Sequence, residues 1–249
     1  VTPELNCDFS QSQKIHYIFG PEKDIATCKE LHRAWDLTST HVDSLSSRLR
    51  EQRKLAKSVR AAKGQKGLRD LFLLLLGTGN LATYIIRANA SVRPLKRVLV
   101  WGRTASNAGK VVDQMNAELD GIEVSVVDNL EEACGQSDII VSATGSHEPL
   151  VKGDWVKPGT HTDFIGNHHA DKRECDTALV LKSKVYADSY ANCFKEAGEI
   201  LVPISEGVFT KEDVVADLSE MCGGSAPLRQ SDDEVTLFKS IGMGISDLV

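Results

Sequence analysis

Two glycines and an alanine stand at a spacing that suits the binding of a diphosphate. Gly77, Gly79 and Ala82 follow directly after a run of six apolar residues, 71–76, and a helical pattern covers 80–90. The first glycine tolerates the tight turn, the second lets a diphosphate approach, and the small third residue lets the helix pack closely on the strand. The amides that open the helix, together with its dipole, favour negative charge. This stretch therefore predicts a dinucleotide-binding turn, with cofactor-binding residues Gly77, Thr78, Gly79, Asn80 and Leu81.

The next predicted strand, 98–101, ends beside residues that suit a further phosphate. In a dinucleotide-binding unit, an acidic residue about 20 positions beyond the glycines binds the ribose 2′-hydroxyl of NAD, whereas an arginine accommodates the 2′-phosphate of NADP. Arg103 and Thr104 stand at this strand tip, without an acidic residue. We therefore predict NADPH as the cofactor, with NADH as the alternative, unless Arg103 is merely a surface residue. The cofactor-binding residues predicted here are Trp101, Gly102, Arg103, Thr104 and Asn107.

Small residues follow the fourth predicted strand, 139–143. The carboxyl end of a parallel strand is where a nicotinamide ribose is expected to pass. Ala143, Thr144 and Gly145 are therefore also predicted to bind the cofactor, although the same residues would suit a simple tight turn.

The elements that must position these residues alternate along the chain from residue 71 onward. Short apolar strands are predicted at 71–76, 98–101, 124–127, 139–143, 162–165, 185–187 and 235–238. Helices are predicted at 80–90, 105–118, 131–136, near 175–181 and at 211–222. This alternation is typical of a parallel α/β sheet, here a doubly wound sheet of the Rossmann type. Before it, a short strand at 15–19 and helices at 24–35 and from 43 onward are predicted.

The composition is that of an ordinary soluble globular protein, with 249 residues, 41% hydrophobic and 26% charged. No apolar run approaches the roughly 18 residues that span a bilayer, and no signal peptide is visible. The six cysteines are scattered and have no metal-ligand spacing, so we predict that they are reduced thiols. We therefore predict a cytoplasmic protein with no membrane partner and no metal site.

Positive charge gathers in one stretch, although the net charge is −6. Residues 48–69 carry nine Lys or Arg and only one acidic residue, Glu51. Such a run could meet nucleic acid or phosphate, but a solvated helix face or a connector is the commoner explanation. Because no aromatic residue lies among these charges to stack on bases, we expect no nucleic-acid partner.

Ordered motifs along residues 71–249 resemble those of the ornithine cyclodeaminase/mu-crystallin family. They read GTGNLA, VLVWGRT, SDIIVSATGSHEPL, GDWVKPGTHTDFIG, DKRE, AGEILVPISEG, ADLSEM and DEVTLFKSIGMGISDL. The resemblance implies a Rossmann domain paired with a substrate domain that also mediates homodimerisation. It implies a divergent substrate and dimerisation region over 1–69, an NAD(P)-binding domain over 70–239, and a C-terminal helix over 240–249 that returns to the first region.

Two positions resemble the imine reductases of the family more than its deaminases. Deaminating members carry an Asp in a G-x-D-x-P-G-K-x-E pattern, and His168 stands at that position here. Asp163 stands where the cyclodeaminases show Asn, as in the G-T-H-V-D-L-V-G motif common in proline-forming imine reductases. The resemblance therefore implies NADPH-dependent reduction of a small cyclic imino acid, 1-pyrroline-2-carboxylate or 1-piperideine-2-carboxylate, to L-proline or L-pipecolate.

Reduction of a cyclic imine needs a hydride, a proton for the nitrogen and a cation for the substrate carboxylate. Asp163 is predicted to stabilise the iminium or to orient a water that protonates the nitrogen. His168 is a second catalytic candidate, because its reference pKa lies near neutrality; a surface or capping role is the alternative. The family's carboxylate clamp has no recognisable counterpart in 1–69. Ornithine cyclodeaminase and a non-catalytic, crystallin-like NADPH-binding protein remain the alternative functions.

Overall fold

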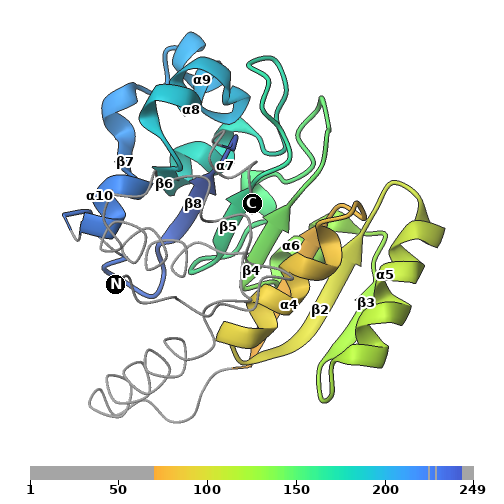
Figure 1. The fold of residues 1–249 in the computed structure, drawn as a ribbon. Coiled ribbons are helices and arrows are strands. Elements are labelled where there is room, and N and C mark those ends of the chain that lie inside the picture. Colours follow the sequence, from red (N-terminus) through yellow and green to blue (C-terminus); the bar gives the residue numbers. More distant parts are fainter. Residues whose placement is uncertain (1–69, 224, 228, 243–249) are drawn as a thin grey trace, which may run out of the picture.

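One parallel sheet organises the part of the chain that the structure describes (Figure 1). The computed structural model describes residues 70–223, 225–227 and 229–242, so every prediction made for 1–69 lies outside the described residues. The strand order is β3-β2-β1-β4-β5-β8-β6-β7, and each neighbouring pair is parallel. The strands are β1 (Leu71–Leu76), β2 (Leu95–Trp101), β3 (Glu123–Val126), β4 (Ile139–Ser142), β5 (His161–Phe164), β6 (Ser183–Ala187), β7 (Val214–Asp217) and β8 (Val235–Lys239).

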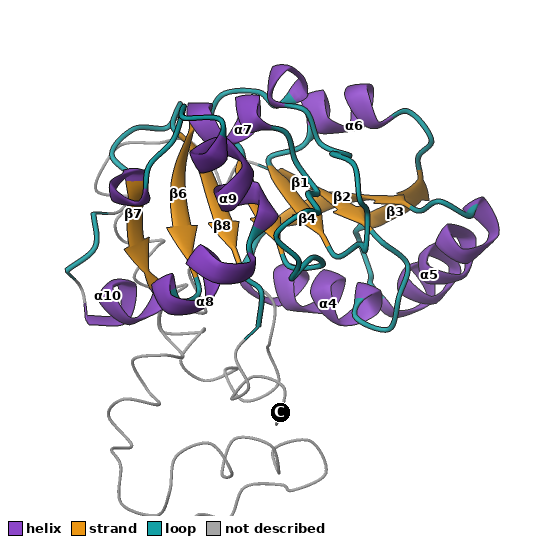
Figure 2. Ribbon diagram, turned by 90° about the horizontal axis from the view of Figure 1, so that it is seen from above, coloured by secondary structure: helices purple, strands orange, loops and turns teal. Residues whose placement is uncertain are grey.

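Helices cover both faces of this sheet, which explains the unbroken apolar run of β1. Leu74 and Leu76 pack on the face that α6 (Leu130–Gln136) and α7 (Thr177–Lys182) cover. Leu73 and Leu75 point to the other face, which α4 (Ala82–Val92) and α5 (Ala105–Glu118) cover. Figure 2 shows these two helix pairs on opposite sides of the strands. A strand buried on both faces needs apolar residues at every position rather than at alternate ones.

Three further helices complete the layers beside the later strands. Residues of α8 (Tyr190–Glu196) and α9 (Gly198–Ser205) join the core on the α6 and α7 face. Leu218 and Met221 of α10 (Leu218–Gly223) pack with Tyr186 and Phe238 in a separate cluster. Two short 3₁₀ helices lie at η1 (Gly153–Trp155) and η2 (Lys211–Asp213).

The structure confirms the predicted parallel sheet but corrects the helix predicted at 211–222. That stretch contains η2, then β7, then α10. Val214 and Ala216 are buried while Val215 and Asp217 are half-buried, which is the period-two pattern of a strand. Pairing of β7 with β6 fixes this conformation. Helices α8 and α9 had not been predicted.

Only the first three residues of the helix predicted over 240–249 are described in the structure. Residues 240–242 have no regular secondary structure, and 243–249 lie outside the described residues, so a helix there stays a prediction. In the described part of the chain, no helix has the length and apolar character needed to cross a bilayer. The same residues contain no cluster of three or more His, Cys, Asp or Glu side chains that would hold a metal ion.

Candidate functional site

The glycines of the turn between β1 and α4 have different surroundings. Gly77 has a φ of +114°, and a Cβ there would lie 2.5 Å from the carbonyl oxygen of Ala143. Protein packing therefore requires glycine at this position. A Cβ on Gly79 would meet nothing within 4 Å. The second glycine thus faces open space, as expected where a diphosphate approaches the backbone.

The tip of β2 lies against this turn. The Gly77 amide donates to the carbonyl oxygen of Trp101 at 2.9 Å, and a Cβ on Gly102 would lie 2.5 Å from Cγ2 of Thr78. Arg103, at the start of the following loop, is exposed. Thr104 and Asn107, at the beginning of α5, are exposed too. The structure therefore brings the first two groups of predicted cofactor-binding residues together at the carboxyl edge of the sheet.

The helices that begin at this edge differ in how their first amides are satisfied. Neither α4 nor α5 has a side-chain hydrogen bond at its N-cap or an acidic residue in its first turn. Asn129 caps α6, and Asp176 caps α7, through side-chain oxygens that accept from backbone amides. Uncapped amides and a helix dipole without acidic neighbours suit an anion. The starts of α4 and α5, beside the glycine turn, therefore fit phosphates better than the capped starts of α6 and α7 do.

The loops after β4 and β5 touch each other through their backbones. A Cβ on Gly166 would clash with the backbone of Thr144, so glycine is required where these loops meet. Gly145 is exposed, and a Cβ there would meet nothing within 4 Å. Open space beside Gly79 and Gly145, at the ends of adjacent strands β1 and β4, fits an extended dinucleotide.

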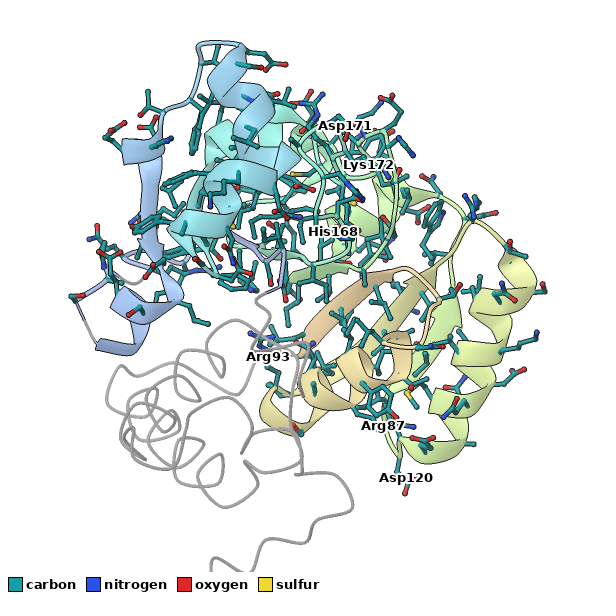
Figure 3. The ribbon with its side chains drawn as sticks, turned by 45° about the horizontal axis from the view of Figure 1, so that its top comes forward. Arg87, Arg93, Asp120, His168, Asp171 and Lys172 are labelled. Atoms are coloured by element: carbon teal, nitrogen blue, oxygen red, sulfur yellow. The ribbon has the colours of Figure 1, made fainter. Side chains whose placement is uncertain are left out.

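His168 lies in the loop that follows β5, where Figure 3 labels it. Its side chain is exposed, and its ring centroid lies 4.5 Å from that of His169. The side chain is therefore accessible from the same edge of the sheet that carries Thr144 and Gly145.

Asp163 is almost completely buried inside the sheet. It is the third of four residues in β5, between Val141 of β4 and Phe238 of β8, and it is 1% exposed. Neither carboxyl oxygen has a hydrogen-bond partner within the described chain. Burial raises the pKa of Asp163 well above its usual value, and the nearby charge of Arg93 opposes this shift only in part. Burial of this kind favours the protonated form of a carboxyl group.

Arg93 follows the last residue of α4, and Figure 3 labels it at that end of the helix. Its guanidinium donates to Oδ1 of Asn89. Burial lowers the pKa of Arg93, while the charge of Asp163 raises it. The charge of Arg93 therefore acts on Asp163 without a hydrogen bond between them, and the sequence had not indicated this cation.

A buried charged network supports the loops after β4 and β5, and the sequence had not indicated it. Its members are Glu174, Glu199 and Lys239, each 0% exposed. Nζ of Lys239 lies 3.0 Å from Oε2 of Glu199, and Oε1 of Glu199 accepts from the Glu174 amide at 2.8 Å. The available signal was that all three are charged positions inside the segments DKRE, AGEILVPISEG and DEVTLFKSIGMGISDL.

The protonation state of Glu174 follows from its donors. Burial raises the pKa of Glu174, whereas the charge of Lys239 and the hydrogen bonds from Ser142 and Thr144 lower it. Its Oε2 also accepts from the amides of Gly166 and Asn167. Because amides can only donate, this geometry is that of an ionised carboxylate.

Curated proteins are similar to this chain over most of its length. The Delta(1)-pyrroline-2-carboxylate reductase of Colwellia psychrerythraea is 43% identical over 177 residues, which make up 71% of this chain and 56% of the relative. The ketimine reductase mu-crystallin of Mus musculus is 32% identical over 177 residues, 71% of this chain and 52% of the relative. The chain therefore spans about half the length of these relatives.

A solved structure shares the fold. The Thermococcus litoralis Delta(1)-pyrroline-2-carboxylate reductase, in complex with NADH and L-proline, superposes with a TM-score of 0.69 and 36% sequence identity, covering 78% of this chain and 59% of the other. The sequence profile of one family matches residues 58–249, more than three quarters of the chain. The chain thus belongs to the ornithine cyclodeaminase/mu-crystallin family, as its ordered motifs had predicted.

Proposed function

We propose that this chain is an NADPH-dependent reductase of cyclic imino acids, with 1-pyrroline-2-carboxylate or 1-piperideine-2-carboxylate as substrate and L-proline or L-pipecolate as product. The observation that carries the proposal is the open space beside Gly79, between two helix starts without caps or acids. The 43% identity to a pyrroline-2-carboxylate reductase and the likeness to a reductase bound to NADH and L-proline support the substrate class.

The cofactor assignment rests on the turn and on the tip of β2. The amides at the start of α4 hold the diphosphate beside Gly79, and the exposed Arg103 and Thr104 hold the 2′-phosphate of NADPH. NADH remains the alternative, since the Thermococcus litoralis relative was solved with it.

The chemistry divides between cofactor and protein. When bound, the nicotinamide supplies the hydride. Thr144 and Gly145 hold the ribose next to it at the end of β4. Asp163, whose burial favours the protonated carboxyl, provides a proton, directly or through a water, for the substrate nitrogen. His168 is the second catalytic candidate and lies exposed in the loop after β5.

Deamination of ornithine is the less favoured reaction for this site. The deaminating members place an Asp where this chain has His168, so the carboxylate that acts on a substrate amine is replaced by an imidazole.

The proposal includes a homodimer in the cytoplasm, which the resemblance implies. Light scattering of the purified protein would measure the mass of the dimer.

The test is NADPH oxidation with a panel of cyclic imines, run beside ornithine and beside pyruvate plus ammonia. We expect NADPH consumption that depends on a cyclic imino acid and a matching amount of cyclic amino acid as product. Ammonia released from ornithine would identify a cyclodeaminase instead. Tight NADPH binding without any imine-dependent oxidation would identify a non-catalytic NADPH-binding protein.

A further inference from the structure

Glu174 holds two loops with two different oxygens. Its Oε1 accepts from Oγ of Ser142 at 2.6 Å and from both the amide and the hydroxyl of Thr144 at 2.8 Å. Its Oε2 accepts from the amides of Gly166 at 2.8 Å and Asn167 at 3.2 Å. One oxygen therefore fixes the end of β4 and the other fixes the end of β5.

The other two members of the network, Glu199 and Lys239, fix the position of Glu174 in turn. The Glu174 amide donates to Glu199, and Glu199 pairs with Lys239. Nζ of Lys239 also donates to the carbonyl oxygen of Asn167 at 2.7 Å. Three charged groups at 0% exposure are costly, and apolar residues of similar volume often give a more stable core. Stability alone does not account for this arrangement.

We propose that Glu174 is a positioning residue that sets the spacing of the loops after β4 and β5, so that Thr144 meets the nicotinamide half of the bound cofactor. This inference rests on the proposed function. It assigns to Glu174 no contact with substrate or cofactor, because the side chain is buried beneath the loops that it holds.

The groups that donate to the Glu174 carboxylate predict which of the two loops depends on its negative charge. The amides of Thr144, Gly166 and Asn167 can only donate, whereas the hydroxyls of Ser142 and Thr144 can also accept. In Glu174→Gln, the one remaining carbonyl oxygen satisfies most amides when it faces Gly166 and Asn167. The new NH₂ group then faces the hydroxyls, and the Thr144 amide loses its acceptor. The loop after β4 should loosen while the loop after β5 stays in place.

The experiment compares two ligands by calorimetry on the wild type and on E174Q. NADPH contacts the whole site, whereas 2′,5′-ADP carries only the adenosine end with its 2′-phosphate. We expect the Kd of NADPH to rise about tenfold or more in E174Q, and the Kd of 2′,5′-ADP to stay within about twofold. The control is E131Q, which makes the same change at an exposed position of α6 and should alter neither Kd.

Equal weakening of both ligands in E174Q, or no weakening of either, would overturn the inference, because a merely structural role does not distinguish the two ends of the cofactor. Failure of the wild type to bind NADPH overturns the proposed function first. If E174Q does not fold, E174D keeps the charge on a side chain too short to reach both loops. It should shift the ratio of the two Kd values in the same direction, and an unchanged ratio contradicts the inference.

Discussion

The two halves of the carboxyl edge are built by different means. The half at β1 and β2 consists of residues close in sequence, 77–107, and offers backbone amides, open space beside Gly79 and the exposed Arg103. The half at β4, β5 and β8 is held by buried charges, Glu174, Glu199 and Lys239, which come from separate parts of the chain. The first half has accessible backbone amides and open space, whereas the second half keeps the loops after β4 and β5 in place through buried hydrogen bonds.

This difference implies different sensitivities to substitution. Changes in the glycine half should affect ligand binding and leave the fold intact wherever the structure leaves open space. Changes in the charged half should affect stability, because each removed charge leaves a partner buried without compensation.

The largest effect is expected for Lys239→Met. This change leaves Glu199 buried without its cation, and we expect the free energy of unfolding to fall by about 3–5 kcal/mol. Denaturation by urea measures it. The matched control is Lys184→Met, which removes a solvent-accessible ion pair with Glu234 and should lower stability much less.

The double variant Lys239→Met, Glu199→Leu removes both charges and should recover part of the lost stability. A double variant less stable than Lys239→Met would show that Glu199, which also accepts from the Glu174 amide, stabilises the protein independently of Lys239.

Substitutions of Gly79 and Gly77 should differ in their effects on stability and on NADPH binding. Gly79→Val keeps the fold, since a Cβ there meets nothing within 4 Å, and should raise the Kd of NADPH about 100-fold, or about 2.7 kcal/mol. Gly77→Ala places a side chain at a φ of +114° and against Ala143, so it should lower stability as well. Calorimetry with thermal denaturation tests both. A well-folded Gly79→Val that binds NADPH as the wild type does would move the diphosphate away from this turn.

Asp163→Asn should reduce activity and raise stability at neutral pH. We expect turnover to fall by well over about tenfold, with the Kd of NADPH unchanged, because the variant cannot supply a proton. Unchanged turnover would remove Asp163 from the mechanism.

The stability effect of Asp163 has a definite sign. The pKa of Asp163 in the folded protein lies above the unfolded value of 3.8, so its contribution to stability is present below that pH and is lost as the pH rises toward the folded pKa. Asn does not titrate. The Tm of Asp163→Asn relative to the wild type should therefore increase from about pH 4 to about pH 8. Parallel Tm curves would show that the buried carboxyl is not the titrating group.

The smallest effect is expected for Arg103→Ala. Its side chain is exposed, so the fold should not change, and loss of one charged contact should raise the KM for NADPH about fivefold to tenfold, or about 1 kcal/mol. The KM for NADH should change much less. Equal changes for both cofactors would mean that Arg103 does not bind the 2′-phosphate.

The sequence predicted the half of the site that depends on local geometry. The apolar run of β1, Gly77 and Gly79 report sterics that act within a few residues, and the order of strand and helix follows from them. The strand β7 was missed because 214–217 is short and only its pairing with β6 shows that it is extended.

The charged half could not be predicted because its distances are set by the whole fold. Glu174 and Lys239 are 65 positions apart in sequence, and nothing in their neighbours indicates a common partner, Glu199. Asp163 could be named as a candidate from its motif, but its burial between β4 and β8 and the nearby charge of Arg93 follow from the whole fold.

The place of β8 in the sheet has a consequence for how the protein is made. Among the described strands this one is the last in sequence order, yet it lies between β5 and β6. While the ribosome is still translating the residues before Val235, the strands β5 and β6 each present an unpaired edge that the missing strand will fill. Insertion of β8 then completes the sheet and brings Lys239 to Glu199 in the same step. A nascent chain stalled just before this point would have two unpaired strand edges, which could pair with other chains, and a buried Glu199 without its cation.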